Sequence, residues 1–164
     1  MSIQRPSRPP SSPYITPEGF EALQAEHKAL WLRRRDVTAA LTAAAAEGDR
    51  SENAEYLYRK KELRGIDRRI RYLQKRLPIL KVVRERPTDP NKVFFGAYVT
   101  LEDKTGRELR YRIVGADEFD PKKGWISIDA PVARALLNKG VDEEIRVLGP
   151  EGEMRYCILD IRYS

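Results

Sequence analysis

The chain has 164 residues, a net charge of +6 and a single cysteine. This length suffices for one large or two small domains, and one cysteine excludes both a disulfide framework and a cysteine-based zinc site. The sequence has no run of 18 apolar residues to span a membrane and no apolar segment of a secretory signal at its start, so we expect a cytoplasmic protein.

The positive charge is unevenly distributed along the chain. The excess of Lys and Arg over Asp and Glu lies in the first 80 residues, and the remainder is balanced. A basic first half predicts contact with a polyanion there. A balanced second half is typical of an ordinary folded module.

The first predicted helix follows a polar tail. Residues 1–13 are rich in Pro, Ser and Arg, a composition that predicts a disordered tail. Thr16 is the expected helix cap, with Pro17 in the first helical position. Apolar residues then recur at alternating intervals of three and four, which predicts a seam against a second helix. His27 and Arg34 interrupt this seam, and we interpret His27 as a hydrogen-bonded spacer rather than a metal ligand.

A second apolar seam of mostly the same spacing runs from Tyr56 to Leu77, and Pro78 discourages its continuation. Two such seams joined by a short turn predict an antiparallel coiled-coil hairpin over residues 14–80. Residues 48–51 are then the tip of the hairpin.

The period changes to two residues after a proline-containing linker at 81–92. We expect a sheet-plus-helix domain at 93–164, in which Cys157 is a buried strand residue. One short helix is expected at 129–140, with Asp129 as its cap, Pro131 at its start and Gly140 at its end. The expected strands are 93–102, 108–115, 124–129, 143–149 and 154–163.

Two carboxylates stand three residues apart at the tip, Asp49 and Glu52. One interpretation is structural, because this spacing resembles a capping box with Asp49 or Ser51 as the cap. The other is that two exposed carboxylates bind Mg²⁺ weakly and become effective when a partner supplies the remaining ligands. Beside a phosphodiester that already has one metal, they would complete a two-metal centre.

Basic residues gather on one face of the second helix. At about 100° per residue they occupy an arc about 100° wide opposite the apolar seam, and Glu62 and Asp67 fall outside it. A face of one sign predicts contact with a phosphate backbone without base specificity, although a simply solvated face remains an alternative. The six residues are Lys60, Lys61, Arg64, Arg68, Arg71 and Lys75.

Four stretches carry a resemblance to a known family. GDRSENAEY (48–56) and YRKKELRGIDRRIRYL (58–73) resemble the hairpin tip and second helix of the bacterial Gre transcript cleavage factors, and the dense basic run is more similar to the GreB type than to the GreA type. KVFFGAYV (92–99) and WISIDAPVARALL (125–137) are similar to the C-terminal domain of that family. The resemblance covers about residues 14–163.

The resemblance implies a two-domain α+β fold, with an N-terminal antiparallel coiled-coil hairpin and a C-terminal FKBP-like domain. It implies a monomer that is not itself an enzyme and that binds RNA polymerase, with DNA-binding in the transcription complex. The C-terminal domain would dock at the secondary channel, and the hairpin would enter it. There the polymerase's own active site would cleave the 3′ end of backtracked RNA.

Individual roles follow from the same resemblance. Asp49 and Glu52 match the acids that help to hold the second Mg²⁺. Asp129 and Pro131 match a segment implicated in polymerase docking, although Ala130 stands where GreB-type sequences often have Ser. The residues that match a basic patch guiding the RNA are Arg50, Lys60, Lys61, Arg64 and Arg68.

Three alternatives remain open at this point. A protein of the same shape can occupy the channel and inhibit without cleavage. An FKBP-like domain suggests prolyl isomerase activity, but a fold does not imply a function. A basic helical hairpin is also compatible with a general RNA-binding protein that needs no polymerase.

Overall fold

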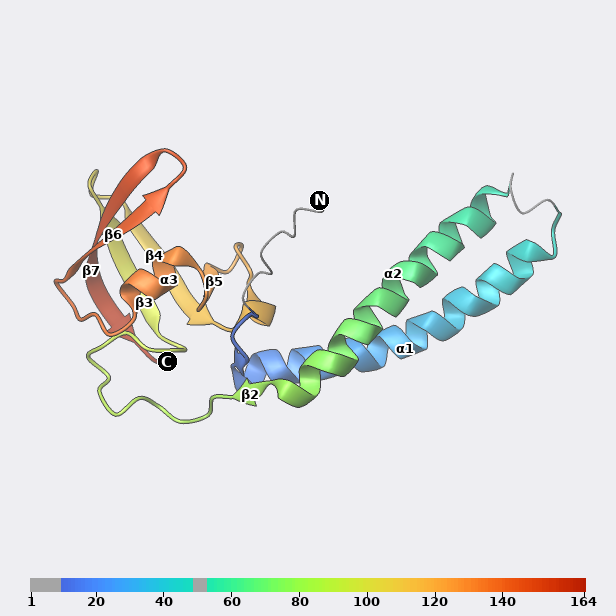
Figure 1. The fold of residues 1–164 in the computed structure, drawn as a ribbon, viewed down its shortest axis with the longest axis horizontal. Coiled ribbons are helices and arrows are strands. Elements are labelled where there is room, and N and C mark those ends of the chain that lie inside the picture. Colours follow the sequence, from blue (N-terminus) through green and yellow to red (C-terminus); the bar gives the residue numbers. More distant parts are fainter. Residues whose placement is uncertain (1–9, 49–52) are drawn as a thin grey trace, which may run out of the picture. The chain divides into compact units, whose positions relative to one another are not determined.

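A computed structural model describes residues 10–48 and 53–164 (Figure 1). The chain forms two compact units, one of Phe20–Leu80 and one that joins Met1–Gly19 to Lys81–Ser164. The expected α+β class, with an N-terminal helical part and a C-terminal sheet part, is confirmed. The division shows, in addition, that the first turn of the first helix belongs to the sheet unit.

Two long helices, α1 (Pro17–Ala45) and α2 (Ala54–Arg76), form the helical hairpin. Helix α1 begins as expected, because the Thr16 hydroxyl accepts a hydrogen bond of 3.1 Å from the Gly19 amide. The seams predicted from the spacing are the faces that meet, and both helices bury them against each other. The central contacts are made by Leu30, Val37, Leu63, Ile66 and Ile70.

Helix α2 ends where Pro78 was expected to stop it, and a single 3₁₀ turn, η1 (Leu77–Ile79), follows. The chain then enters a two-residue strand, β2 (Lys81–Val82), which pairs in parallel with β1 (Tyr14–Ile15). The segment expected to be a linker therefore begins with a strand. A strand of two residues is too short to show a period in the sequence, so the pairing had no signal there.

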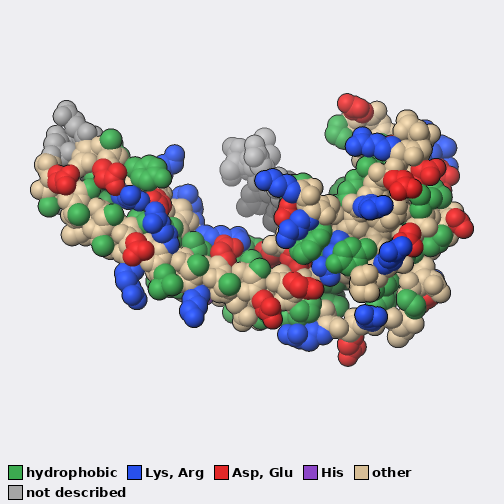
Figure 2. Space-filling view, turned by 180° about the vertical axis from the view of Figure 1, so that it is seen from behind, with side chains coloured by type: hydrophobic (Ala, Val, Ile, Leu, Met, Phe, Trp, Pro, Cys, Tyr) green, Lys and Arg blue, Asp and Glu red, His purple; other side chains and the backbone are tan. Residues whose placement is uncertain are grey.

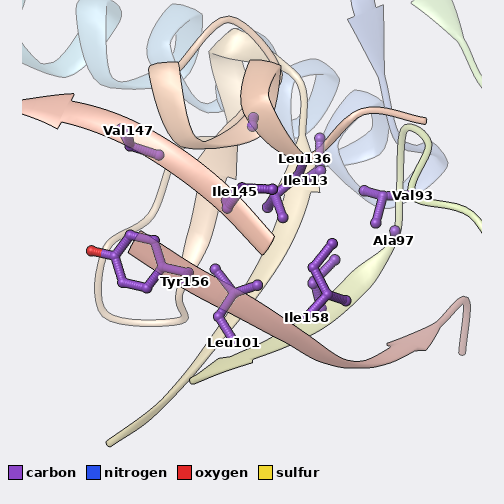
Figure 3. Close-up of a cluster of buried hydrophobic side chains, with 11 residues drawn as sticks. Val93, Ala97, Leu101, Ile113, Leu136, Ile145, Val147, Tyr156 and Ile158 are labelled. Atoms are coloured by element: carbon purple, nitrogen blue, oxygen red, sulfur yellow. The ribbon is translucent and has the colours of Figure 1, made fainter. Parts of the chain in front are cut away.

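The second unit contains a five-stranded sheet in the order β5-β4-β3-β7-β6, antiparallel except for the parallel pair β4–β5. Side chains from one face of this sheet and from helix α3 (Pro131–Leu136) form the main core, including Leu101, Ile113 and Ile158 (Figure 3). A 3₁₀ turn, η2 (Ala116–Glu118), follows β4. The strands are β3 (Tyr98–Asp103), β4 (Glu108–Val114), β5 (Trp125–Ser127), β6 (Glu144–Gly149) and β7 (Gly152–Arg162).

Three boundary predictions in this unit need correction. The first strand begins at Tyr98 rather than at residue 93, because Gly96 has a φ of +87° and interrupts the extended chain. Helix α3 has Ala130 as its N-cap, without a side-chain hydrogen bond, so Asp129 is not the cap. The helix ends before the predicted Gly140, because Asn138 adopts a left-handed φ of 67°. Cys157 lies on β7 but is only half-buried.

A buried carboxylate holds the first turn of α1 in the sheet unit. Glu118 is only 8% exposed, and it accepts hydrogen bonds from the Thr16 amide at 3.0 Å, the Gly115 amide at 2.7 Å and the Thr16 hydroxyl. The packing is so close that a Cβ on Gly19 would overlap the carboxylate of Glu118. A larger residue at that position of α1 would displace the Glu118 side chain from its hydrogen bonds.

Among the described residues, none of the helices combines the length and the apolar content that crossing a bilayer requires.

Candidate functional site

The hairpin turn carries the two predicted metal-binding acids. Helix α1 ends at Ala45, Gly48 has a φ of +134°, and α2 begins at Ala54. Asp49, Arg50 and Glu52 lie outside the described residues 10–48 and 53–164. Their roles in holding a metal and guiding RNA therefore stay predictions.

The side chain of Asn53 closes the turn from the described side. Its Oδ1 accepts a hydrogen bond of 3.1 Å from the Tyr56 amide, which makes Asn53 the N-cap of α2. Its Nδ2 donates at 2.8 Å to the carbonyl oxygen of Ala44, in the last turn of α1. One amide group thus satisfies a free donor of one helix and a free acceptor of the other.

This cap bears on the structural interpretation of the tip acids. The capping interpretation required α2 to start at Asp49 or Ser51, and it is wrong because the cap is Asn53. Asn is among the best N-cap residues, so the sequence did contain this signal. The position of the cap of α2 is thus Asn53, four residues after Asp49 and one after Glu52.

Ion pairs across the hairpin join two acidic side chains of α2 to arginines of α1. Arg33 donates to Glu62 at 2.8 Å, and Arg34 donates to Asp67 at 2.7 Å. Arg34, a polar interruption of the predicted seam, is therefore an ion-pair partner. Because these arginines lie on α1, the two acids of α2 are turned toward α1 and away from the outer face.

A third pair links Arg69 of α2 to Glu26 of α1 through two hydrogen bonds of 2.7 and 2.8 Å. The hydrogen bond from Arg69 lowers the pKa of the Glu26 carboxyl from its usual value, against a smaller opposing effect of burial. The pair therefore contributes to stability at neutral pH, and that contribution is lost as the pH falls through the lowered pKa of Glu26. Both side chains are over one-third exposed, so water screens the interaction and its contribution is small.

The predicted basic stripe is present on α2. We use the name basic stripe for the six residues Lys60, Lys61, Arg64, Arg68, Arg71 and Lys75. All six are exposed, and none forms an ion pair with another residue in the part of the chain that the structure describes. Figure 2 shows basic side chains projecting from the helical hairpin, with acidic side chains among them. A face with one sign of charge is suited to contact with phosphates.

His27 is occupied as a hydrogen-bond acceptor. It accepts a hydrogen bond of 3.3 Å from the indole of Trp31, as expected for a spacer. Within residues 10–48 and 53–164 there is no group of three or more His, Cys, Asp or Glu side chains that could hold a metal ion.

The predicted docking segment lies at the start of α3. Pro131 is the first residue of the helix and is exposed. The carboxylate of Asp129 accepts hydrogen bonds from the Ser12 amide, at 2.9 Å, and from the Ser12 hydroxyl. Part of the N-terminal segment, to which the sequence assigned no role, thus contacts one of the two residues expected to dock.

Two family models of transcription elongation factors together match most of the chain. A model described as "Transcription elongation factor, N-terminal" matches residues 13–82, and one described as "Transcription elongation factor, GreA/GreB, C-term" matches residues 87–163. The chain belongs to the GreA/GreB family, and its curated relatives place it with the GreB type.

Two of these relatives align over nearly their full length. Transcription elongation factor GreB from Pseudomonas aeruginosa is 57% identical over 164 residues, which cover 99% of this chain and 98% of the relative. The GreB of Xanthomonas axonopodis pv. citri is 57% identical, covering 100% and 99%. A solved GreA/GreB elongation factor from Nitrosomonas europaea is 23% identical with a TM-score of 0.43, covering 93% of this chain and 100% of that one.

The role of Asn53 predicts how the tip variants behave in unfolding. Asn53→Ala removes the cap and the tie to Ala44, so we expect the unfolding free energy of the hairpin to fall by about 1–2 kcal/mol. Asn53→Asp keeps the oxygen that caps α2, so its unfolding free energy should fall by less than that of Asn53→Ala. Asp49→Asn/Glu52→Gln should stay within about 0.5 kcal/mol of the wild type. Urea unfolding followed by far-UV circular dichroism measures all three, and a double variant as unstable as Asn53→Ala would restore a capping role for the acids.

Proposed function

We propose that the chain binds RNA polymerase, inserts its helical hairpin into the secondary channel and stimulates cleavage of backtracked RNA by the polymerase's own active site. Membership of a family of elongation factors supports the partner. The observation that carries the activity is an outer face of one charge on α2, a helix that Asn53 caps directly after the two acids in the sequence. The protein would act in the cytoplasm, as a monomer that assists the polymerase and is not itself the catalyst.

The tip acids are proposed to hold Mg²⁺ together with the polymerase. Carboxylate oxygens are the donors that Mg²⁺ prefers, and Asp49 and Glu52 leave most of its coordination positions to other ligands. Mg²⁺ held there would supply the charge that orients and activates an attacking water. The contribution of this chain is to carry the two carboxylates at the end of a rigid support, which Asn53 closes on both helices.

The basic stripe is proposed to hold the displaced RNA by its phosphates. Arg50 and four members of the stripe, Lys60, Lys61, Arg64 and Arg68, would guide the 3′ segment toward the tip acids. Contacts of this kind depend on charge and not on base identity. Glu62 and Asp67 are paired with arginines of α1. Their carboxylates therefore do not face RNA bound along the basic stripe.

A second candidate function keeps the architecture and changes the outcome. A factor of this shape that occupies the channel without placing a metal would modulate or inhibit the polymerase. The presence of both tip acids, free of the cap role, favours cleavage over inhibition.

Replacing the tip acids tests the main proposal. In a stalled, backtracked elongation complex with Mg²⁺, Asp49→Asn/Glu52→Gln should reduce the RNA cleavage rate by about 100-fold or more, equivalent to at least about 2.7 kcal/mol of lost transition-state stabilisation. Polymerase affinity should be unchanged. Glu47→Gln, an exposed acid next to the turn, is the matched control and should cleave like the wild type. If the wild type binds polymerase but does not stimulate cleavage, the protein is a channel-occupying regulator.

Neutralising the stripe tests its binding to RNA. Arg64→Gln/Arg68→Gln should slow cleavage of long extruded RNA and reduce the salt dependence of RNA binding, by about 0.7 in log–log slope for each phosphate that the chain no longer neutralises. Lys28→Gln/Arg35→Gln makes the same charge change at exposed positions of α1 and serves as control. Equal effects of the two double variants would mean that the stripe acts only through net charge.

The hydrogen bonds between Ser12 and Asp129 predict opposite effects on docking. Asp129→Asn should weaken polymerase binding by roughly tenfold, equivalent to about 1.4 kcal/mol. Ser12→Ala removes the hydroxyl donor to Asp129 and keeps the amide hydrogen bond, so it should strengthen binding about two- to tenfold, since one hydrogen bond contributes about 0.5–1.5 kcal/mol. Competition binding to core polymerase measures both, with Glu151→Gln, an exposed loop acid of the same unit, as control. Unchanged binding in Asp129→Asn would remove this residue from the docking surface.

A further inference from the structure

The sheet of the second unit has one face that α3 does not cover. Side chains alternate along its strands, so Val99 and Leu101 of β3 enter the core while Tyr98 and Thr100 point to the other side. Tyr98 is paired with Arg112 across the β3–β4 ladder, and Thr100 with Arg110. These residues line a hollow of about 470 Å³, which we call the open sheet groove.

The charge of the groove is predominantly positive. Four cationic side chains and the carboxylate of Asp160 line it, and that carboxylate is bound by Arg162 at 2.7 Å. Within residues 10–48 and 53–164, neither Arg110 nor Lys123 forms an ion pair. The groove is therefore complementary to an anion with several charges. Its cations are Arg110, Arg112, Lys123 and Arg162.

Aromatic rings lie between these cations. The guanidinium of Arg112 is 4.7 Å from the ring centre of Tyr98 and 5.1 Å from that of Trp125. The ammonium of Lys123 is 4.7 Å from the Trp125 ring, and Arg112 also donates to the Gly96 carbonyl at 3.4 Å. These interactions position Arg112 and Lys123 without a ligand, and 38% of Tyr98 remains exposed.

We propose that the open sheet groove binds single-stranded RNA, at a surface separate from the basic stripe. Arg110, Lys123 and Arg162 contact successive phosphates, and a base stacks on the exposed part of Tyr98. The combination of a cationic groove with an aromatic ring is what binding of a single strand without sequence preference requires. An acidic protein segment would use the cations and have no need of the ring.

The test separates this groove from the stripe. The parent is the full chain in which all six stripe residues are changed to Gln, so that remaining RNA binding reports on the sheet unit. These changes are Lys60→Gln, Lys61→Gln, Arg64→Gln, Arg68→Gln, Arg71→Gln and Lys75→Gln. Fluorescence anisotropy with a fluorescein-labelled oligouridylate, over a range of salt, gives the affinity. Adding Arg110→Gln/Lys123→Gln should weaken binding about five- to twentyfold and lower the log–log salt slope by about 1.4. Lys104→Gln/Lys139→Gln, at exposed positions outside the groove, should leave both unchanged.

The ring is tested by a pair of variants on the same parent. Tyr98→Leu should weaken binding at least about fivefold because the base can no longer stack, while Tyr98→Phe retains the ring and should bind like the parent. A fall in affinity with both substitutions would contradict stacking.

Three results would overturn the proposal. They are the absence of RNA binding by the parent, equal binding by Tyr98→Leu, and binding of a labelled oligoglutamate as tight as that of the RNA. The last would identify the groove as a site for an acidic protein segment. None of them bears on cleavage by the tip acids, which is measured with polymerase and an intact stripe.

Discussion

The two helices of the hairpin are joined at the turn by one side chain, the amide of Asn53. By accepting from the first turn of α2 and donating to the last turn of α1, it ties the two helix ends to each other. An antiparallel pair of helices can slide by a turn unless its end is fixed, and each slide would change which charges meet. With this closure, Arg33 and Arg34 meet Glu62 and Asp67. The single sign of the basic stripe follows from the positions of its residues around α2, and the register of the hairpin decides which arginines of α1 meet Glu62 and Asp67.

The sheet unit has its own fixed point in the carboxylate of Glu118. A buried carboxylate is stable only when its oxygens are satisfied, and here three donors from Thr16 and Gly115 do so. The residues it joins are distant in sequence, since β1 and the first turn of α1 precede the hairpin and η2 follows β4. The sheet unit therefore contains the chain on both sides of the helical segment Phe20–Leu80.

Regular geometry explains what the sequence was able to predict. The helices, their facing seams and the basic stripe all follow from a fixed period of residues per turn, whereas the Thr16 cap follows from the residue type and from Pro17 after it. Three contacts join segments that are distant in the sequence, and no local sequence pattern predicts them. They are the β1–β2 pair, the hydrogen bonds of the buried Glu118 and those of Ser12 to Asp129. The open sheet groove was only partly predictable from the sequence. The alternation of Arg110 and Arg112 along β4 was visible, but the rings beside them come from β3 and β5.

The placement of the two tryptophans gives each unit a natural optical reporter. The chain has only Trp31 and Trp125, and they fall in different compact units. Trp31 is 46% exposed on α1 and bonded to His27, whereas Trp125 is flanked by two cations on the sheet. Their emission spectra should therefore differ, and a chain that keeps one indole would follow the melting of a single unit. Whether the hairpin and the sheet unfold together or in sequence can then be read from intrinsic fluorescence alone.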